Sequence, residues 1–443
     1  GYFRQNGYIT MGSGKLYHPG LPADYDYAKS WSPEWPYFDP ECRHKTDCPS
    51  AEPRKPPRPS RCLDWEPKQK RVTHEVNTND HHDVCSVDMP ANESRPEYQL
   101  PDMLTRDSCI RQLRTAKASG KNFFIGCGFR KPHIPWVAPA EFWNYFPQSL
   151  GDIPLAKYPY APVGVPEVAY HLTSREPGGF RHVPFNGTVN HHLARAYRRA
   201  YYATVAFTDY NVGLILAALD ELGLSDDTAV VLMGDHGWHL GEGGLWAKYT
   251  NFENAARVPL IIRAPWIKSA KGTVTDVLAE AVDLYPTMAE LAGLPDPKTQ
   301  GEELNGTSLV PVLEDVRNTH VKKAAYSQYA KTNIDKDPFN INPYYEKHST
   351  EALGYSVRVE NWRYSVWFRV PKGLITPDTK DVLGRELYSH FGDDGDFDFT
   401  GENANVVDDP SHADLVERLH SMILDYIQIW PRDAPAAVET VFA

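Results

Sequence analysis

The sequence contains no run of eighteen or more apolar residues, and its acidic side chains outnumber its basic ones. The absence of a long apolar run predicts that no segment spans a membrane. Lys and Arg number 46 against 58 Asp and Glu, and the net charge of −12 argues against nucleic acid as the main partner. A small anionic substrate remains compatible with this charge, because a locally cationic pocket can override the global sign.

The chain also lacks an initiator Met and a recognisable signal peptide, so we expect a processed or truncated product. Three N-x-S/T sequons are present, and we predict a glycan at each of Asn92, Asn186 and Asn305. Together with a cysteine-rich segment, the sequons favour a protein of the secretory pathway, either lysosomal or secreted.

The cysteine-rich segment lies within residues 19–101, which are rich in Pro and charge and predict a long excursion from the core. Covalent closure stabilises such a polar stretch most. We therefore predict two disulfides, Cys42–Cys48 and Cys62–Cys85.

A zinc site is the alternative to these disulfides. Its histidine ligands would be His44, His81 and His82. Paired C-x2-C spacings are absent, which makes zinc the weaker interpretation. The two remaining cysteines, Cys109 and Cys127, lie in apolar patterns and are predicted to be thiols in the core.

Helical and strand patterns alternate through the middle of the chain. A helix predicted at 102–119 precedes a buried strand at 122–129, and a helix at 191–221 precedes a strand at 228–234. Further segments are predicted as strands at 258–265 and 275–282 and as a helix at 283–293. Helices that alternate with buried strands predict an α/β fold with a mostly parallel central sheet.

The pattern changes beyond about residue 320. Residues 355–368 alternate apolar and polar side chains around a turn, which predicts an antiparallel hairpin, and residues 412–430 predict an amphipathic helix. A chain of this length exceeds one ordinary core. We therefore predict a large α/β domain at 1–320 and a smaller α+β subdomain at 321–443.

Polar residues follow apolar stretches at three places in the chain. Ligands of open α/β sheets bind at the carboxyl ends of the strands, so we expect these residues to share one site. The candidates are Lys15, His18, His133, Asp235, His236 and Lys248. The carboxylate suits Ca²⁺ or Mg²⁺, the lysines suit anionic oxygens, and the histidines can transfer a proton.

Glycine is frequent in the loop GDHGWHLGEGG at 234–244. Gly237, Gly241, Gly243 and Gly244 would let the backbone approach a ligand closely. A flexible surface turn explains the same glycines, and a single Asp-His-Gly sequence does not separate the two interpretations.

The stretch GDHGWHLGEGGLWAKYTNFENAARVPLII resembles the second signature region of the sulfatase family, and within it the iduronate-2-sulfatase branch. Other stretches resemble that branch in the same order along the chain. They are GYITMGSGKLYHPG, FFIGCGFRKPHIPW, YYATVAFTDYNVGLIL, VDLYPTMAELAGL, AYSQY, LGYSVRVENWRYSVW and RELYSH. Two positions depart from the branch: Gly234 stands where Ser is usual, and Gly243 stands where His is usual, which leaves the recognised sugar open.

The resemblance implies an alkaline-phosphatase-like α/β sandwich with a smaller C-terminal subdomain and one bound Ca²⁺. It implies hydrolysis of sulfate esters of sulfated sugars of the glycosaminoglycan class. The roles it implies are metal ligation by Asp235 and His236, sulfate binding by Lys15 and Lys248, a place beside the nucleophile for His18, contact with sulfate and the leaving group for His133, and pocket shaping by Trp238 and Trp246.

Sulfatases also carry a formylglycine nucleophile, made within a C-x-P-S-R motif, and an Asp-Asp pair, both before the G-K-x-x-H-P-G motif. The C-x-P-S-R motif occurs nowhere in these 443 residues, and no Asp-Asp pair precedes Gly14, where the G-K-x-x-H-P-G motif begins. We expect both on an N-terminal fragment outside this chain, which would then be a partner of the chain, and we expect the chain alone to be inactive. One alternative is an inactive sulfatase-fold protein that binds glycans or has a structural role outside the cell. Another is a phosphatase or phosphodiesterase of the same superfamily.

Overall fold

The computed structural model describes most of the chain. The described residues are 1–17, 26–35, 37–40, 72–76, 84–87, 90–92, 94, 99–171, 185–301, 304–318, 320–339, 349–393 and 401–429, with only the backbone at 27–28, 72–76, 84–86, 401 and 429. Several predicted residues fall outside this set, or are described in their backbone only. They are His18, Cys42, Cys48, Cys62, the zinc candidates His44, His81 and His82, and the side chain of Cys85.

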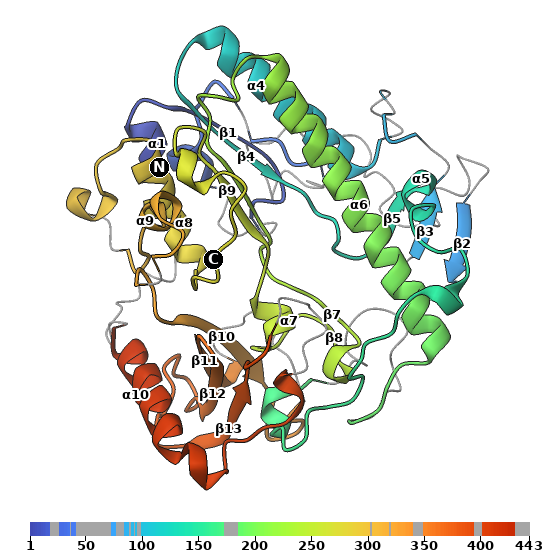
Figure 1. Ribbon diagram of the computed structural model, residues 1–443, viewed down its shortest axis with the longest axis vertical. Coiled ribbons are helices and arrows are strands. Elements are labelled where there is room, and N and C mark those ends of the chain that lie inside the picture. The colour runs from blue at the N-terminus through green and yellow to red at the C-terminus, as the bar shows by residue number, and fades with distance from the viewer. Residues whose placement is uncertain are drawn as a thin grey trace.

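Two strand pairs lie at the centre of the larger part of the molecule (Figure 1). β1 (Ile9–Gly14) pairs in parallel with β4 (Phe123–Gly128), and β6 (Val230–Met233) pairs antiparallel with β9 (Leu260–Arg263). The strands predicted at 122–129, 228–234 and 258–265 are therefore confirmed.

Two long helices, α4 (Pro101–Ser119) and α6 (His191–Glu221), pack against each other beside these strands (Figure 1). Pro101 stands in the first turn of α4, where its missing N–H costs nothing, and Gly120 ends the helix in the left-handed region with φ 64°. The Asn190 side chain caps α6 by accepting a hydrogen bond from the His192 N–H. Both helices confirm the predictions, and the α/β fold class is confirmed with them.

Helix α6 is the one helix within the described ranges that is long and apolar enough to cross a membrane. A helix in the core of a protein passes the same test. The buried Ala200, Ala203 and Phe207 of α6 pack with Phe142 of α5 (Ala140–Trp143) and with other residues of the main hydrophobic core.

The segment predicted as a strand at 275–282 does not form one; it leads through a short turn into α8 (Leu284–Leu291). The Glu280 N–H donates to the Asp283 carboxylate at 2.7 Å, and Lys322 Nζ donates to both oxygens of Asp283 at 2.7 Å each. This prediction was wrong because polar turn contacts hold the backbone of an apolar stretch, which the apolar pattern does not record.

The C-terminal part is a four-stranded antiparallel sheet in the order β10-β11-β12-β13, with α10 (Ala413–Ile429) against it (Figure 1). The strands are β10 (Ala325–Thr332), β11 (Thr350–Val359), β12 (Trp362–Arg369) and β13 (Val382–Ser389). The predicted hairpin and terminal helix are confirmed. The boundaries 1–320 and 321–443 stay a prediction.

Shorter elements connect these layers. They are α1 (Tyr2–Gln5), α2 (Tyr27–Ser30), β2 (Val72–Val76), β3 (Val84–Val87), β5 (Trp136–Pro139), β7 (His239–Leu240), β8 (Trp246–Ala247), α7 (Glu253–Ala256) and α9 (Val310–Glu314).

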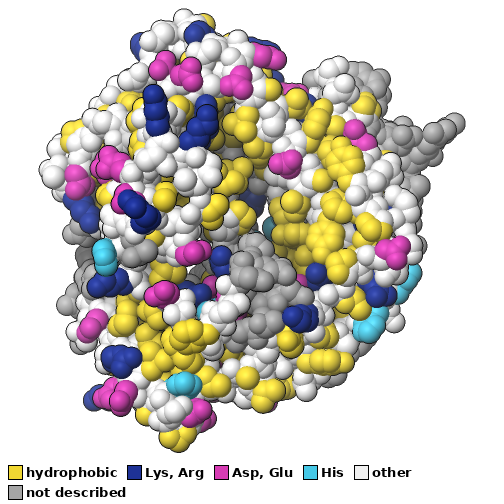
Figure 2. All heavy atoms as spheres, viewed as in Figure 1, with side chains coloured by type: hydrophobic (Ala, Val, Ile, Leu, Met, Phe, Trp, Pro, Cys, Tyr) yellow, Lys and Arg dark blue, Asp and Glu magenta, His cyan; other side chains and the backbone are white. Residues whose placement is uncertain are grey.

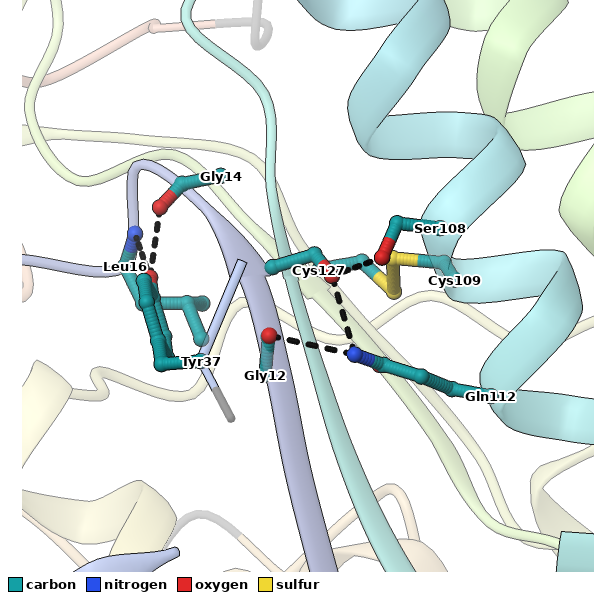
Figure 3. The surroundings of a disulfide bond; sticks show 9 residues. Gly12, Gly14, Leu16, Tyr37, Ser108, Cys109, Gln112 and Cys127 are labelled. Atoms are coloured by element: carbon teal, nitrogen blue, oxygen red, sulfur yellow. Dashed lines mark hydrogen bonds between the residues drawn. A yellow bond between two sulfur atoms is a disulfide. The ribbon is translucent and has the colours of Figure 1, made fainter. Parts of the chain in front are cut away.

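A disulfide joins Cys109 of α4 to Cys127 of β4 (Figure 3). The prediction of two core thiols was therefore wrong. The helix packs directly on the strand that follows it and brings the two Cα atoms to 6.2 Å, within reach of a bridge. Beside the disulfide, Gln112 Nε2 of α4 donates to the Gly12 carbonyl at 3.1 Å, which ties the helix to β1 as well.

Candidate catalytic site

Four of the six candidate residues meet at the carboxyl ends of β1 and β6. Lys15 Nζ lies 3.6 Å from Asp235 Oδ2, and His236 Nε2 lies 3.5 Å from the same oxygen. Lys248 Nζ lies 2.9 Å from His236 Nε2. The structure therefore brings together residues separated by more than 230 positions in the chain, as predicted from the ends of the strands.

Lys15 reaches this site because β1 and β4 approach very closely at their ends. The Lys15 N–H donates to the Gly128 carbonyl at 2.7 Å. A Cβ atom on Gly128 would lie 2.3 Å from the Lys15 carbonyl carbon, so only glycine fits at this position.

His133 approaches the same site from the loop after β4. Its ring centre lies 6.0 Å from that of Trp238, which in turn lies 6.5 Å from that of His236. Two backbone N–H groups at the start of the loop, those of Arg130 and Lys131, donate to the Asp102 carboxylate at 2.9 Å each. The fifth candidate is thus held beside the other four, and the sixth, His18, lies outside the described residues.

The same loop is closed on itself. Lys131 Nζ donates to the Pro135 carbonyl at 2.6 Å and to the His133 carbonyl at 3.2 Å. The peptide bonds before Pro132 and Pro135 are both cis. The two hydrogen bonds of Lys131 hold the turn that presents His133, an arrangement that suits a residue with a fixed chemical task.

Hydrogen bonds determine the tautomers of the two site histidines. His236 Nδ1 lies 2.9 Å from the Gly237 carbonyl, and His133 Nδ1 lies 2.6 Å from the Ile134 carbonyl. A carbonyl oxygen only accepts, so each Nδ1 carries the hydrogen and each Nε2 presents a lone pair. The Nε2 lone pair of His236 accepts a hydrogen bond from Lys248 Nζ.

Charge and burial tune the titratable groups of the site. Partial burial raises the pKa of Asp235, but the charges of His236, Lys15 and Lys248 outweigh it and hold the pKa below its usual range. Burial and the Lys248 charge lower the pKa of His236. Burial lowers the pKa of His133 to about 2, with a further contribution from nearby lysine and arginine charges. The site therefore holds a carboxylate, two neutral imidazoles and two lysine side chains.

Two other polar residues of the loop have a different task. Glu242 Oε2 accepts from the Leu240 N–H at 2.6 Å, and Glu242 Oε1 accepts from Arg198 Nη1 of α6 at 2.7 Å. His239 Nε2 lies 3.0 Å from Thr250 Oγ1 in the interior. Glu242 and His239 close and anchor the β7–β8 hairpin, which carries His236 at one end and Lys248 at the other.

The glycines of the loop serve the protein's own packing. A Cβ atom on Gly237 would lie 2.0 Å from the Asn254 carbonyl oxygen, and one on Gly244 would lie 2.8 Å from the Tyr170 hydroxyl. Gly241 and Gly243 adopt φ values of 108° and 64°, in the left-handed region. The sequence predicted that these glycines would let a ligand approach the backbone. At Gly237 and Gly244 the group that approaches is another part of this chain.

The two tryptophans lie in different surroundings. Trp238 lies between His133 and His236, and its buried indole N–H has no hydrogen-bond partner among the described residues. Trp246 is 2% exposed and packs edge-on against Tyr197 of α6, at a ring-centre distance of 5.9 Å. Trp238 is thus placed where a ligand would arrive, whereas Trp246 belongs to the hydrophobic core.

Metal ligands are only partly supplied by the described residues. Among these residues no group of three or more His, Cys, Asp and Glu side chains is arranged to hold a metal ion. Asp235 offers a carboxylate whose side chain is 69% exposed, and His236 offers the Nε2 lone pair that accepts from Lys248 Nζ in this structure. The pair fits a part of a Ca²⁺ site, which needs six to eight ligands, mostly oxygen.

Sequence reasoning missed the residues that hold the site in place. Asp102, Arg198 and Arg363 are the main ones. Arg363 of β12 donates through Nη1 to the Asn251 carbonyl at 2.8 Å, three residues beyond Lys248. The one available signal was that these charged residues stand within apolar patterns, where an unpaired charge would be costly.

Known proteins were compared with this chain. The family model described as Sulfatase matches residues 62–294, more than half of the chain. The chain belongs to the sulfatase family. A second model, described as the C-terminal part of N-sulphoglucosamine sulphohydrolase, matches residues 241–364.

Two curated sulfatases resemble this chain along most of its length. Iduronate 2-sulfatase of Mus musculus is 32% identical, with 95% of this chain and 77% of that protein covered. Iduronate 2-sulfatase of Homo sapiens is 31% identical, with 87% of this chain and 73% of that protein covered. The resemblance to the iduronate-2-sulfatase branch is therefore confirmed.

Solved structures confirm the fold. The phosphonate monoester hydrolase of Agrobacterium radiobacter superposes with a TM-score of 0.63 at 19% identity, covering 96% of this chain and 79% of that one. A protein solved with its substrate D-glucosamine-2-N,6-O-disulfate superposes with a TM-score of 0.61 at 17% identity, covering 98% of this chain and 82% of that one. The chain has the alkaline-phosphatase-like architecture of sulfatases.

Proposed function

We propose that this protein hydrolyses sulfate esters of sulfated sugars, of the iduronate 2-sulfate and glycosaminoglycan class. The observation that carries the proposal is the approach of Lys15 and Lys248 to the Asp235–His236 pair. Two ammonium groups beside a carboxylate suited to a cation make a site for a small, multiply charged oxyanion. We infer the sulfated sugar as substrate from the names of the two relatives that are 31–32% identical to this chain.

The residues of this chain divide the work between binding and proton transfer. The Lys15 and Lys248 ammonium groups offset negative charge on the sulfate oxygens as it grows in the transition state. His133 presents Nε2, and an anion bound beside it favours the charged ring, which can then protonate the leaving sugar oxygen. Ca²⁺, held in part by Asp235 and His236, would add positive charge when bound.

We propose that the nucleophile is a formylglycine on an N-terminal fragment outside these 443 residues. Support comes from the edges of β4 and β6, which pair with β1 and β9 but with no strand between them among the described residues. Phe123 and Ile125 of β4 and Val230 of β6 nevertheless pack on one shared cluster. One added strand in this slot would end beside His133 and Asp235, where further carboxylates and a nucleophile would complete the site.

Exposed apolar side chains also support an added strand between β4 and β6. Figure 2 shows hydrophobic side chains gathered over α6. Val205 and Leu216 of α6 are 43% and 39% exposed, and Ile261 of β9 is 61% exposed. A patch of this kind on a sheet and its neighbouring helix calls for a covering segment.

We propose that the protein is made in the secretory pathway, and that it is lysosomal or secreted. The Cys109–Cys127 disulfide supports an oxidising compartment. Asn92, Asn186 and Asn305 are all exposed, as glycan attachment requires.

Peptide mass mapping and a hydrolysis assay on the native protein test the function together. A C-x-P-S-R peptide with the mass of formylglycine, together with release of sulfate from a uronate 2-sulfate, is the expected result. This chain alone should release none. A native protein without formylglycine and without hydrolysis would instead be an inactive glycan-binding protein of the same fold. Release of phosphate in place of sulfate would make it a phosphatase of the superfamily.

A further inference from the structure

Three neighbouring side chains on the surface form a feature that the proposed catalytic site does not use. Tyr158 and Tyr160 are 37% and 54% exposed, and Lys157 Nζ lies 5.7 Å from the centre of the Tyr158 ring. We call Lys157, Tyr158 and Tyr160 the tyrosine platform. Two exposed aromatic rings, one of them beside a cation, offer apolar faces, hydroxyl groups and positive charge on a short segment.

The tyrosine platform is attached to the tip of the β7–β8 hairpin. The Gly243 N–H donates to the Tyr158 carbonyl at 2.7 Å. A Cβ atom on Gly244 would lie 3.2 Å from the Pro159 carbonyl oxygen, so the glycine lets the two segments meet. In Figure 1 the chain that follows α5 runs past this hairpin.

The other end of the hairpin carries the catalytic residues. Lys248 lies five residues beyond Gly243, and five extended residues span at most about 17 Å. The tyrosine platform therefore lies within the length of a short oligosaccharide from the catalytic lysine.

We propose that the tyrosine platform binds those sugar residues of a sulfated oligosaccharide that extend beyond the residue in the catalytic site. The inference rests on the proposed function. Aromatic faces pack against the apolar faces of sugar rings, and the Lys157 ammonium pairs with a sulfate or carboxylate group of the chain. Three side chains are too few for a protein partner, since stable protein interfaces bury about 800 Å² on each side.

Calorimetric titration of this chain with three probes tests the proposal. The probes are inorganic sulfate, a uronate 2-sulfate monosaccharide and a heparin-derived tetrasaccharide. We expect the tetrasaccharide to bind at least about tenfold more tightly than the monosaccharide. Tyr160→Ala and Tyr158→Ala should each reduce tetrasaccharide affinity about threefold to tenfold and leave monosaccharide affinity unchanged. Lys157→Ala should lower the salt dependence of tetrasaccharide binding.

A matched control and a separate variant distinguish the possible failures. Tyr145 is 67% exposed next to α5, and Tyr145→Ala should bind all three probes as the unaltered chain does. Equal affinity for monosaccharide and tetrasaccharide, or an unchanged preference in Tyr160→Ala, would overturn the tyrosine platform while the proposed function stands. Sulfate and monosaccharide binding that survives Lys248→Ala would overturn the proposed function itself.

Discussion

Lys248 Nζ donates a hydrogen bond of 2.9 Å to Nε2 of His236, although the residues are twelve positions apart and at opposite ends of a hairpin. An ammonium group on a neutral imidazole keeps the His236 lone pair aimed into the site. The backbone on both sides of Lys248 is unusual, with φ 71° at Ala247 and φ 31° at Tyr249. Such conformations cost about 1–3 kcal/mol each and persist where the surrounding structure imposes them.

Lys248→Ala should abolish most activity in the intact protein and leave its stability almost unchanged. Loss of one charged donor to a developing oxyanion lowers kcat about 10²-fold to 10³-fold. Lys248 is half-buried and contacts His236 and the Tyr249 ring, which belong to the site, so the free energy of unfolding should shift by less than about 1 kcal/mol. Sulfate release and thermal unfolding measure the two effects. Lys121→Ala, an exposed lysine before β4, is the control.

The protonation of His133 should respond to a bound anion. Burial lowers the pKa of His133 to about 2, so its ring stays neutral as the pH falls from 7 to 4. Sulfate beside the ring favours the charged form and raises this pKa. Histidine resonances recorded against pH, with and without sulfate, should show protonation of His133 only with sulfate. The exposed His320 should behave the same in both series. Identical His133 titrations at saturating sulfate would exclude its role in proton transfer.

Glu386 should make the protein more stable in acid than in mild base. Burial raises the pKa of this carboxyl to about 7, although the Tyr388 hydroxyl and the Trp367 indole donate to it. A carboxyl whose folded pKa exceeds its unfolded value binds more protons when folded. Its stabilisation is therefore complete below about pH 4.5 and is lost as the pH rises through about 7, a total of about 3 kcal/mol.

Glu386→Gln therefore should match the unaltered protein near pH 5 and exceed its stability near pH 8 by about 2–3 kcal/mol. Denaturant unfolding at the two pH values gives the comparison. The exposed Glu360→Gln should change neither value. A variant equally destabilised at both pH values would show that Glu386 is ionised throughout.

Arg363 joins the C-terminal sheet to the segment that follows Lys248. It forms ion pairs with Glu253 of α7 and with Glu402, all three side chains being at most 6% exposed. Arg363→Met removes the partner that two buried carboxylates share, leaving Glu253 with Arg358 and Glu402 with His390, and should cost about 3–5 kcal/mol of the free energy of unfolding. Thermal unfolding measures the loss. Arg317→Met, which removes an exposed pair with Asp315, should have no measurable effect.

The disulfide between α4 and β4 should stabilise the sheet that carries Lys15 and His133. It closes a loop with a sequence separation of 18, for which chain entropy predicts about 3 kcal/mol. The double variant Cys109→Ser and Cys127→Ser should lower the midpoint of denaturant unfolding and reduce its dependence on reductant. A reductant effect that survives in this variant would have to come from the cysteines of residues 42–85.

Prediction from the sequence succeeded where the local pattern of apolar and polar residues alone determines the helix or strand. Helix α6 follows from its helical pattern, and the hairpin of β11 and β12 follows from alternation around a turn. It failed at Cys127, where an apolar neighbourhood predicts a thiol as readily as a disulfide. It failed again at 275–282, where Lys322 from a distant segment holds the Asp283 turn.

The sequence by itself determined the chemical inventory of the site: a carboxylate, histidines and two lysines, each placed after an apolar stretch. The tertiary structure decided which of them meet. The parallel pairing of β1 with β4 and the closed β7–β8 hairpin place Lys15, Asp235, His236 and Lys248 so that each contacts the next at 3.6 Å or less. It also decided that Glu242 and His239 anchor that hairpin. Local patterns carry no record of such contacts, since their free energy arises from partners far away in the chain.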